Sequence, residues 1–171
     1  MTATDWMEKH ISGFAELSAE ERVAIQEFSL LWAFFEAQVF NGWASAIAIS
    51  TAIEGHAAKA RLDVRPFESS LEYFSNRYVT KGAINHRFAA LNFRGNDQRE
   101  RVEAVLREEA NDSAEIVIAL LIIVYRLRCN LFHGEKWAYG IQGQRDNFLQ
   151  ATQVLMGALD MLSGRVGTAP A

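Results

Sequence analysis

Cysteine is almost absent from the 171-residue chain, in which Cys129 is the single one. One cysteine forms no internal disulfide and no cysteine-based zinc site, and this excludes the disulfide-rich secreted scaffolds. The histidines are also few and far apart in sequence, with no i,i+4 pair that would predict a metal site: His10, His56, His86 and His133. We therefore expect neither a metal nor a cofactor.

Long apolar runs are missing as well. The most apolar segment, Ile116–Val124, has nine residues, about half of the ~20 that a membrane helix needs. The N-terminus carries Asp5 and Glu8 and lacks the basic start and apolar block of a secretory signal. The glycines at 140 and 143 lack the strand and the Lys-Ser/Thr ending of a phosphate-binding loop. We expect a cytoplasmic protein without a membrane partner.

Proline is scarce, with two residues in the chain, and long stretches are free to be helical. Hydrophobic residues make up 50% of the sequence, enough for a packed core and too many for a disordered chain. With roughly 150 residues per domain as a prior, the length indicates one domain. We predict an all-α, single-domain helical bundle over residues 1–164, followed by a flexible C-terminal tail over residues 165–171.

Apolar periodicity and start and stop signals divide the chain into helices. Ser18 and Glu21 have the spacing of a capping box. The segment from Ala114 to Phe132 is apolar on nearly all sides and is followed by Gly134, so we predict a central buried helix there, with a strand as the weaker alternative. The ranges predicted to be helical are Asp5–Ala15, Ala19–Phe40, Ala44–Leu62, Phe67–Tyr78, Lys81–Asn92, Asp97–Ala110, Ala114–Phe132 and Gln144–Leu162.

The formal net charge of -4 excludes a wholly basic nucleic-acid coat protein. This net charge is unevenly distributed, because the middle segment, residues 61–107, is mildly basic with nine basic and six acidic residues. One interpretation is a solvated helical surface with pairs such as Asp97–Arg101 and Glu103–Arg107. The other is a strip that holds a phosphate backbone.

Polar and basic residues end the apolar segment abruptly, between Tyr125 and Lys136. Because such groups are costly to bury without partners, we expect them at a helix end, a cleft or a subunit interface. Histidine exchanges protons near neutral pH, and arginine pairs bidentately with phosphate. Arg128 and His133 therefore suit metal-free RNA cleavage, and capping of helix-end carbonyls is an equally good interpretation of these residues. The local basic pocket would consist of Arg126, Arg128, His133 and Lys136.

At this point the sequence resembles the HEPN superfamily (higher eukaryotes and prokaryotes nucleotide-binding). Residues Arg128 to His133 fit its R-x4-H motif, and the string RCNLFHGEK at 128–136 is similar to a consensus of bacterial members. One position differs, because Cys129 stands where many active members have a polar residue, often asparagine. The resemblance implies a bundle of four to five core helices with short extra helices.

The resemblance also implies an activity. Many HEPN proteins are metal-independent endoribonucleases that act as toxins, in phage defence or in RNA processing. They work as homodimers in which two motifs face each other across the interface. By this resemblance Arg128 binds and polarises the scissile phosphate, His133 is the general base or acid, and Asn130 is a supporting polar group. On this hypothesis Arg126 and Lys136 bind the RNA substrate.

Two other functions stay open. A non-catalytic HEPN-like module would use its helices to dimerise or to dock a partner, such as an antitoxin or a nucleotidyltransferase. A nucleotide-binding protein would hold phosphates with Arg128 and Lys136 and would cleave nothing. The leading hypothesis differs from both because it predicts RNA products with 2′,3′-cyclic phosphate ends.

Overall fold

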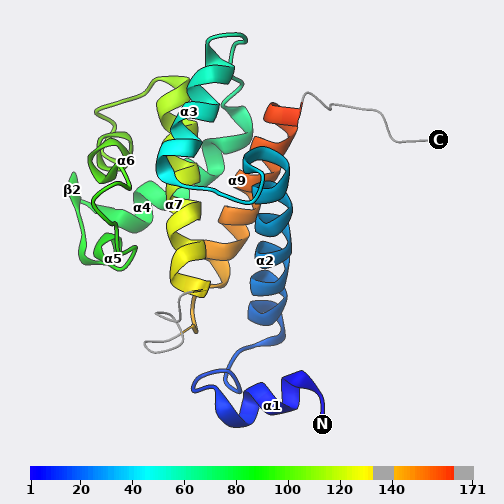
Figure 1. The fold of residues 1–171 in the computed structure, drawn as a ribbon. Coiled ribbons are helices and arrows are strands. Elements are labelled where there is room, and N and C mark those ends of the chain that lie inside the picture. Colours follow the sequence, from blue (N-terminus) through cyan, green and yellow to red (C-terminus); the bar gives the residue numbers. More distant parts are fainter. Residues whose placement is uncertain (133–140, 164–171) are drawn as a thin grey trace.

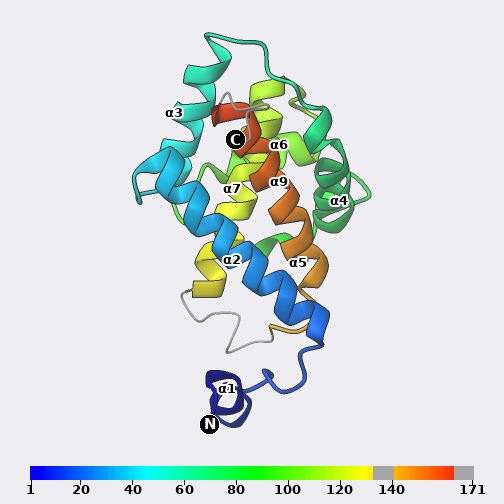
Figure 2. The same ribbon diagram turned by 90° about the vertical axis from the view of Figure 1, so that its right-hand side faces the viewer.

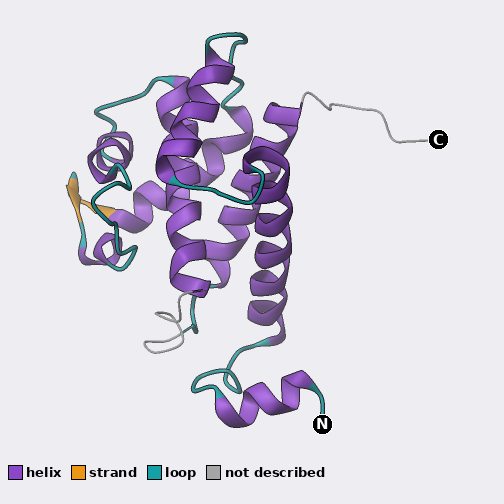
Figure 3. Ribbon diagram, viewed as in Figure 1, coloured by secondary structure: helices purple, strands orange, loops and turns teal. Residues whose placement is uncertain are grey.

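The computed structural model describes residues 1–132 and 141–163, and these are mostly helical (Figures 1 and 3). Two short strands pair antiparallel as a hairpin, β1 (Val79–Thr80) and β2 (Ala83–Ile84). A 3-10 turn, η1 (Arg65–Phe67), leads into α4. The helices are α1 (Ala3–His10), α2 (Ala19–Phe40), α3 (Ala46–Ala57), α4 (Glu68–Tyr78), α5 (His86–Ala89), α6 (Arg99–Leu106), α7 (Ser113–Phe132) and α9 (Arg145–Ser163).

The centre of the fold is α7, which α3 and α6 contact on one side and α9 on the other. In Figure 1, α9 lies between α7 and α2, and Figure 2 shows α2 crossing in front of both. Every side chain from Val117 to Val124 is 0% exposed. A helix that is apolar all round belongs in the interior, so the predicted central helix is confirmed and the alternative strand is wrong.

The start and stop signals of α2 work as the sequence predicts. Ser18 Oγ accepts from the amide of Glu21 at 3.1 Å, and Glu21 Oε2 accepts from the amide of Ser18 at 3.0 Å. These two hydrogen bonds form the capping box and satisfy amides that have no partner within the helix. At the other end Asn41 adopts a left-handed conformation with φ 51° and stops the helix.

The helix predicted over Lys81–Asn92 is wrong. Lys81 and Gly82 both have positive φ, 53° and 75°, and two such residues form the tight turn that matches the twist of a hairpin. The chain therefore reverses between β1 and β2, and helix resumes only for the four residues of α5. Asn85 starts α5 by accepting from the amide of Arg87 at 3.0 Å.

Three other helices are shorter or shifted relative to the prediction. α3 begins only after Ser45, whose hydroxyl caps the amide of Ala48 at 3.1 Å, and it ends at Ala57. α1 starts earlier than predicted because the side chain of Thr2 caps it through the amide of Asp5. α6 covers only part of its predicted range, since Gln98 has a left-handed φ of 54° before its first turn.

Buried apolar side chains from all the long helices form one contiguous core. Gly157 lets α9 pass close to η1, because a Cβ at this position would lie 3.2 Å from the ring of Phe67. No helix in the described part of the chain is long and apolar enough to cross a membrane. The tail predicted for residues 165–171 lies outside the described residues.

Truncating the centre of α7 tests the importance of this core. Ile122 is 0% exposed, so Ile122→Ala should lower the free energy of unfolding by about 2–5 kcal/mol through lost burial and the cavity that remains. Val23→Ala is the control, because Val23 is 50% exposed on α2, and it should change stability by less than about 0.5 kcal/mol. Urea unfolding measures both, and equal losses would contradict the central position of α7.

Candidate functional site

The residues that the motif singles out divide into two groups. Arg126, Arg128 and Asn130 lie on the last two turns of α7. His133 and Lys136 lie outside the described residues. The geometry of the candidate site is therefore that of the C-terminal end of α7 and of the elements packed around it.

The Arg126 side chain is buried and only 2% exposed. Its Nε donates to the carbonyl of Leu91 at 3.0 Å and its Nη2 to the carbonyl of Asn92 at 2.5 Å. Its Nη1 lies 3.0 Å from Oδ2 of Asp97, a carboxylate that is itself 6% exposed. Buried charges need this kind of pairing because their loss of hydration is otherwise uncompensated. The predicted substrate-binding role of Arg126 does not fit this placement.

Asn130 is one helical turn from Arg126 and is 1% exposed. Its Nδ2 donates to the carbonyl of Ala90 at 2.9 Å. Together the two side chains take up three successive carbonyls that follow α5, those of residues 90, 91 and 92. Residues that the motif marks as functional thus hold the turn after α5 against α7.

Arg128 points to the other side of α7, toward α2. Its Nη2 lies 3.6 Å from Oε2 of Glu36, and the centre of its guanidinium lies 5.8 Å from the ring of Trp32 and 5.4 Å from that of Phe132. The side chain is 27% exposed, and its Nε has no hydrogen-bond acceptor among the described residues. Arginine has five N–H donors, so Arg128 keeps donors for a ligand.

Glu36 has partners other than Arg128. The indole Nε1 of Trp32 donates to its Oε2 at 3.2 Å, and the amide of Ala44 donates to its Oε1 at 3.2 Å. The carboxylate is therefore fixed by two neutral donors, and the arginine contact at 3.6 Å is the loosest of its interactions. Sequence analysis missed Glu36, since nothing in the spacing along α2 relates it to a residue 92 positions later.

Cys129, where the sequence departs from the family pattern, faces the interior and is 4% exposed. It lies against Tyr125, whose pKa is raised by burial and by the neighbouring thiol. A polar side chain at position 129 would enter this packed region rather than the surface where Arg128 lies. The cysteine at this position therefore does not contribute to the surface around Arg128, where Glu36 and Trp32 of α2 lie.

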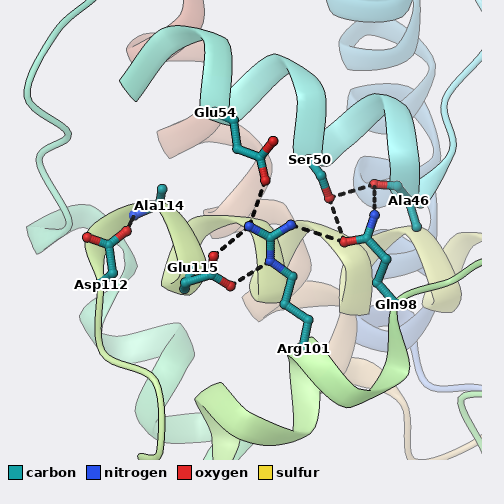
Figure 4. A network of polar contacts seen from close by, with 8 residues as sticks. All are labelled: Ala46, Ser50, Glu54, Gln98, Arg101, Asp112, Ala114 and Glu115. Atoms are coloured by element: carbon teal, nitrogen blue, oxygen red, sulfur yellow. Dashed lines mark hydrogen bonds and ion pairs between the residues drawn. The ribbon is translucent and has the colours of Figure 1, made fainter. Parts of the chain in front are cut away.

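A second arginine forms a network away from the motif (Figure 4). Arg101 of α6 donates twice to Glu115 of α7, with both distances 2.5 Å, and once to Glu54 of α3 at 2.8 Å. Its pKa is raised chiefly by the bonds to Glu115. The network joins three helices and replaces the predicted Asp97–Arg101 pair, because Asp97 binds Arg126 instead.

Further ion pairs weaken the interpretation of residues 61–107 as a basic strip that holds a phosphate backbone, because they neutralise arginines of this segment. Arg99 binds Glu103 at 2.6 Å across one turn of α6, and Arg107 binds Glu109 at 3.1 Å. The predicted Glu103–Arg107 pair is therefore wrong. Within the described ranges no group of three or more histidine, cysteine or acidic side chains is arranged to hold a metal ion.

The chemistry available at the end of α7 is anion binding by the guanidinium of Arg128, through its positive charge and its N–H donors. Figure 2 shows the end of α7 below α2. The proton-exchanging group that the motif adds is His133, five residues farther along the chain. No family model, curated protein or solved structure matches the chain significantly.

Removing the buried arginine should destabilise the fold. Arg126→Gln leaves Asp97 buried without its cation and two carbonyls without donors, so the free energy of unfolding should fall by about 3–5 kcal/mol. Arg145→Gln is the matched control, because Arg145 and Asp146 form an exposed pair with 48% and 65% of their side chains accessible, and it should cost less than about 1 kcal/mol. Chemical denaturation measures both variants. Similar small losses in the two would contradict the structural role of Arg126.

Proposed function

We propose that the chain is a metal-independent endoribonuclease of HEPN type, active as a homodimer. The observation that carries the proposal is the state of Arg128, a 27% exposed arginine at the end of a buried helix whose ion pair among the described residues is a loose 3.6 Å contact with Glu36. It stands five residues before a histidine in the string RCNLFHGEK. The mostly helical fold, with the motif at the end of its central helix, agrees with the architecture that the resemblance implies.

The reaction is an internal transfer of phosphate. The 2′-hydroxyl oxygen of a ribose attacks the adjacent phosphorus while His133 takes its proton. A bond forms between O2′ and phosphorus, the bond from phosphorus to O5′ breaks, and O5′ receives a proton from an imidazolium. Arg128 binds the non-bridging oxygens, where negative charge increases in the transition state. The products are a 2′,3′-cyclic phosphate and a 5′-hydroxyl.

This chemistry assigns different work to the three polar residues of α7. Arg128 contacts the substrate. Asn130 and Arg126 hold the turn after α5 through its carbonyls, and they act on the site only by fixing the end of the helix. The supporting role expected for Asn130 thus becomes a positioning role, exerted through the backbone of residues 90–92.

The proposed dimer needs a surface through which two chains contact each other. α2 has an outward apolar face in which Leu30 is 66% exposed and Phe34 is 54% exposed. At about 100° per residue, Glu36 lies roughly 140° around α2 from the middle of this face, so the face points away from the contact with Arg128. Large exposed apolar side chains grouped on one face mark protein–protein contacts. A second copy placed there would pair the two chains through α2.

A non-catalytic binding module is the second candidate, and the same apolar face of α2 favours it. Such a module would use Leu30 and Phe34 to dock an antitoxin or a nucleotidyltransferase, and it would leave RNA intact. The two candidates differ in what they require of His133, which only the nuclease uses for proton transfer.

The cleavage test uses purified full-length protein and RNA in the presence of EDTA. Arg128→Ala and His133→Ala should each lower the cleavage rate by about 100-fold or more, because each removes a group that acts on the transition state. The matched controls are Arg107→Ala and His10→Ala, which change surface residues directly after α6 and at the end of α1. Product ends are identified by mass spectrometry. Unchanged rates in the two motif variants would refute the nuclease, and intact RNA with wild-type protein would favour the binding module.

The dimer is tested by sedimentation at micromolar concentration. Leu30→Asp combined with Phe34→Asp should convert a dimer into a monomer, because two charges would be buried without partners at the contact. Cleavage should be lost together with the dimer. Ile47→Asp is the control, since Ile47 is 57% exposed on α3 and should leave the oligomeric state unchanged. A wild-type monomer, or a variant that stays dimeric, would contradict this surface.

A further inference from the structure

A small cavity lies where α4, α5, α7 and the start of α9 meet, on the side of α7 away from α2. Its volume is 220 Å³. Leu127 of α7 lines it, while the next residue, Arg128, contacts α2. Successive residues of a helix point about 100° apart, so this cavity is separate from the site around Arg128. The residues that matter for its chemistry are Arg77, His86, Arg87, Gln144 and Asn147.

The charge of this cavity is of one sign. Arg77, His86 and Arg87 line it, and none of the described residues that line it carries a carboxylate. Four other surface hollows of the described chain each include an acidic residue, which is Asp160, Glu100, Asp63 or Asp97. In a protein with an overall charge of -4, two arginines in one hollow are a local departure that favours an anion.

The arginines in the cavity lack counter-ions. Neither Arg77 nor Arg87 forms an ion pair with any described carboxylate. Nε of Arg77 is enclosed and has no hydrogen-bond acceptor in the part of the chain that the structure describes. An enclosed donor without an acceptor costs free energy, and a bound anion would remove that cost.

Two neutral amide side chains, Gln144 and Asn147, also line the cavity. The amide of Asn147 is used within the protein, because Oδ1 accepts from the hydroxyl of Tyr73 at 2.9 Å and Nδ2 donates to Oε1 of Gln144 at 2.6 Å. The second bond fixes the amide of Gln144 and leaves its Nε2 as a donor at the cavity. The position of Gln144 is therefore set by Asn147, which is 2% exposed.

We propose that this cavity is a second anion site that binds a single phosphate group through Arg77, Arg87, His86 and Gln144. Guanidinium groups match the geometry of phosphate oxygens with parallel hydrogen bonds. The volume of 220 Å³ is below the roughly 300–1,000 Å³ of sites that enclose a whole small molecule. A phosphate group enters, and the sugar and base attached to it stay outside.

The source of the phosphate follows from the proposed function, on which this part of the inference rests. A backbone phosphate of RNA, several nucleotides from the scissile bond, would occupy the cavity while Arg128 binds the reacting phosphate. The cavity would then set how far the RNA extends around the end of α7. A free phosphate or the terminal phosphate of a nucleotide has the same oxygen chemistry and is distinguished experimentally.

The first experiment titrates full-length protein with inorganic phosphate and follows the arginine Nε–Hε signals by NMR. The signals of Arg77 and Arg87 should shift and saturate, and Arg87→Gln should weaken this binding by about threefold to tenfold. Arg87 is exposed, so this variant keeps the fold even if Arg77→Gln does not. Lys59→Gln removes the same charge outside the cavity and should change binding by less than twofold. Absent or unsaturable shifts would overturn the phosphate site, whatever the protein does to RNA.

The second experiment measures the binding of a single-stranded RNA oligomer to His133→Ala protein at several salt concentrations. Arg87→Gln in this background should weaken binding about threefold to tenfold and make the slope of log K against log salt less negative by about 0.7. Phosphate binding without such an effect on RNA would overturn the RNA role and leave the phosphate site. An equal effect of Lys59→Gln would show that only the overall charge matters and would also overturn the RNA role.

Discussion

The burial of α7 on every side is the constraint on which the other features depend. A helix without a solvent-facing stripe has no place for a polar side chain that lacks a protein partner. From Val117 to Val124 the sequence meets this condition with apolar residues alone. In the last two turns polar residues appear, and three of them contact neighbouring elements. Arg126 and Asn130 reach backbone carbonyls, and Arg128 reaches the edge of α2.

These contacts explain why three polar residues at the end of α7 have different roles. Arg126 and Asn130 are one turn apart and face the turn after α5. Arg128 lies between them in sequence and faces α2, where solvent begins. The same helix end is therefore rigid on one side and accessible on the other. A reactive group benefits from this arrangement, because fixed neighbours keep its geometry while an open side admits the ligand.

The sequence predicted the parts of the fold that depend on long periodic patterns. α2 coincides with its predicted range, and α7 and α9 begin and end within one residue of theirs. It did not predict the hairpin. The hairpin depends on the positive φ of two residues, Lys81 and Gly82, and a periodic pattern of apolar residues does not reveal this local backbone conformation. For the site, the motif located the end of α7 but not the partner of each cation. Asp97 and Glu36 are distant in sequence, and only the packing of helices brings them to Arg126 and Arg128.

The attachment of Glu36 has a consequence for how Arg128 changes partners. Because the indole of Trp32 and the amide of Ala44 already hold the carboxylate, departure of the arginine would not leave a bare buried anion. The guanidinium centre lies 5.8 Å from the ring of Trp32 and 5.4 Å from that of Phe132, within the range of cation–π attraction. An incoming phosphate would thus replace one counter-ion by another without rebuilding the helix end. Glu36 would then keep the two donors that already hold it.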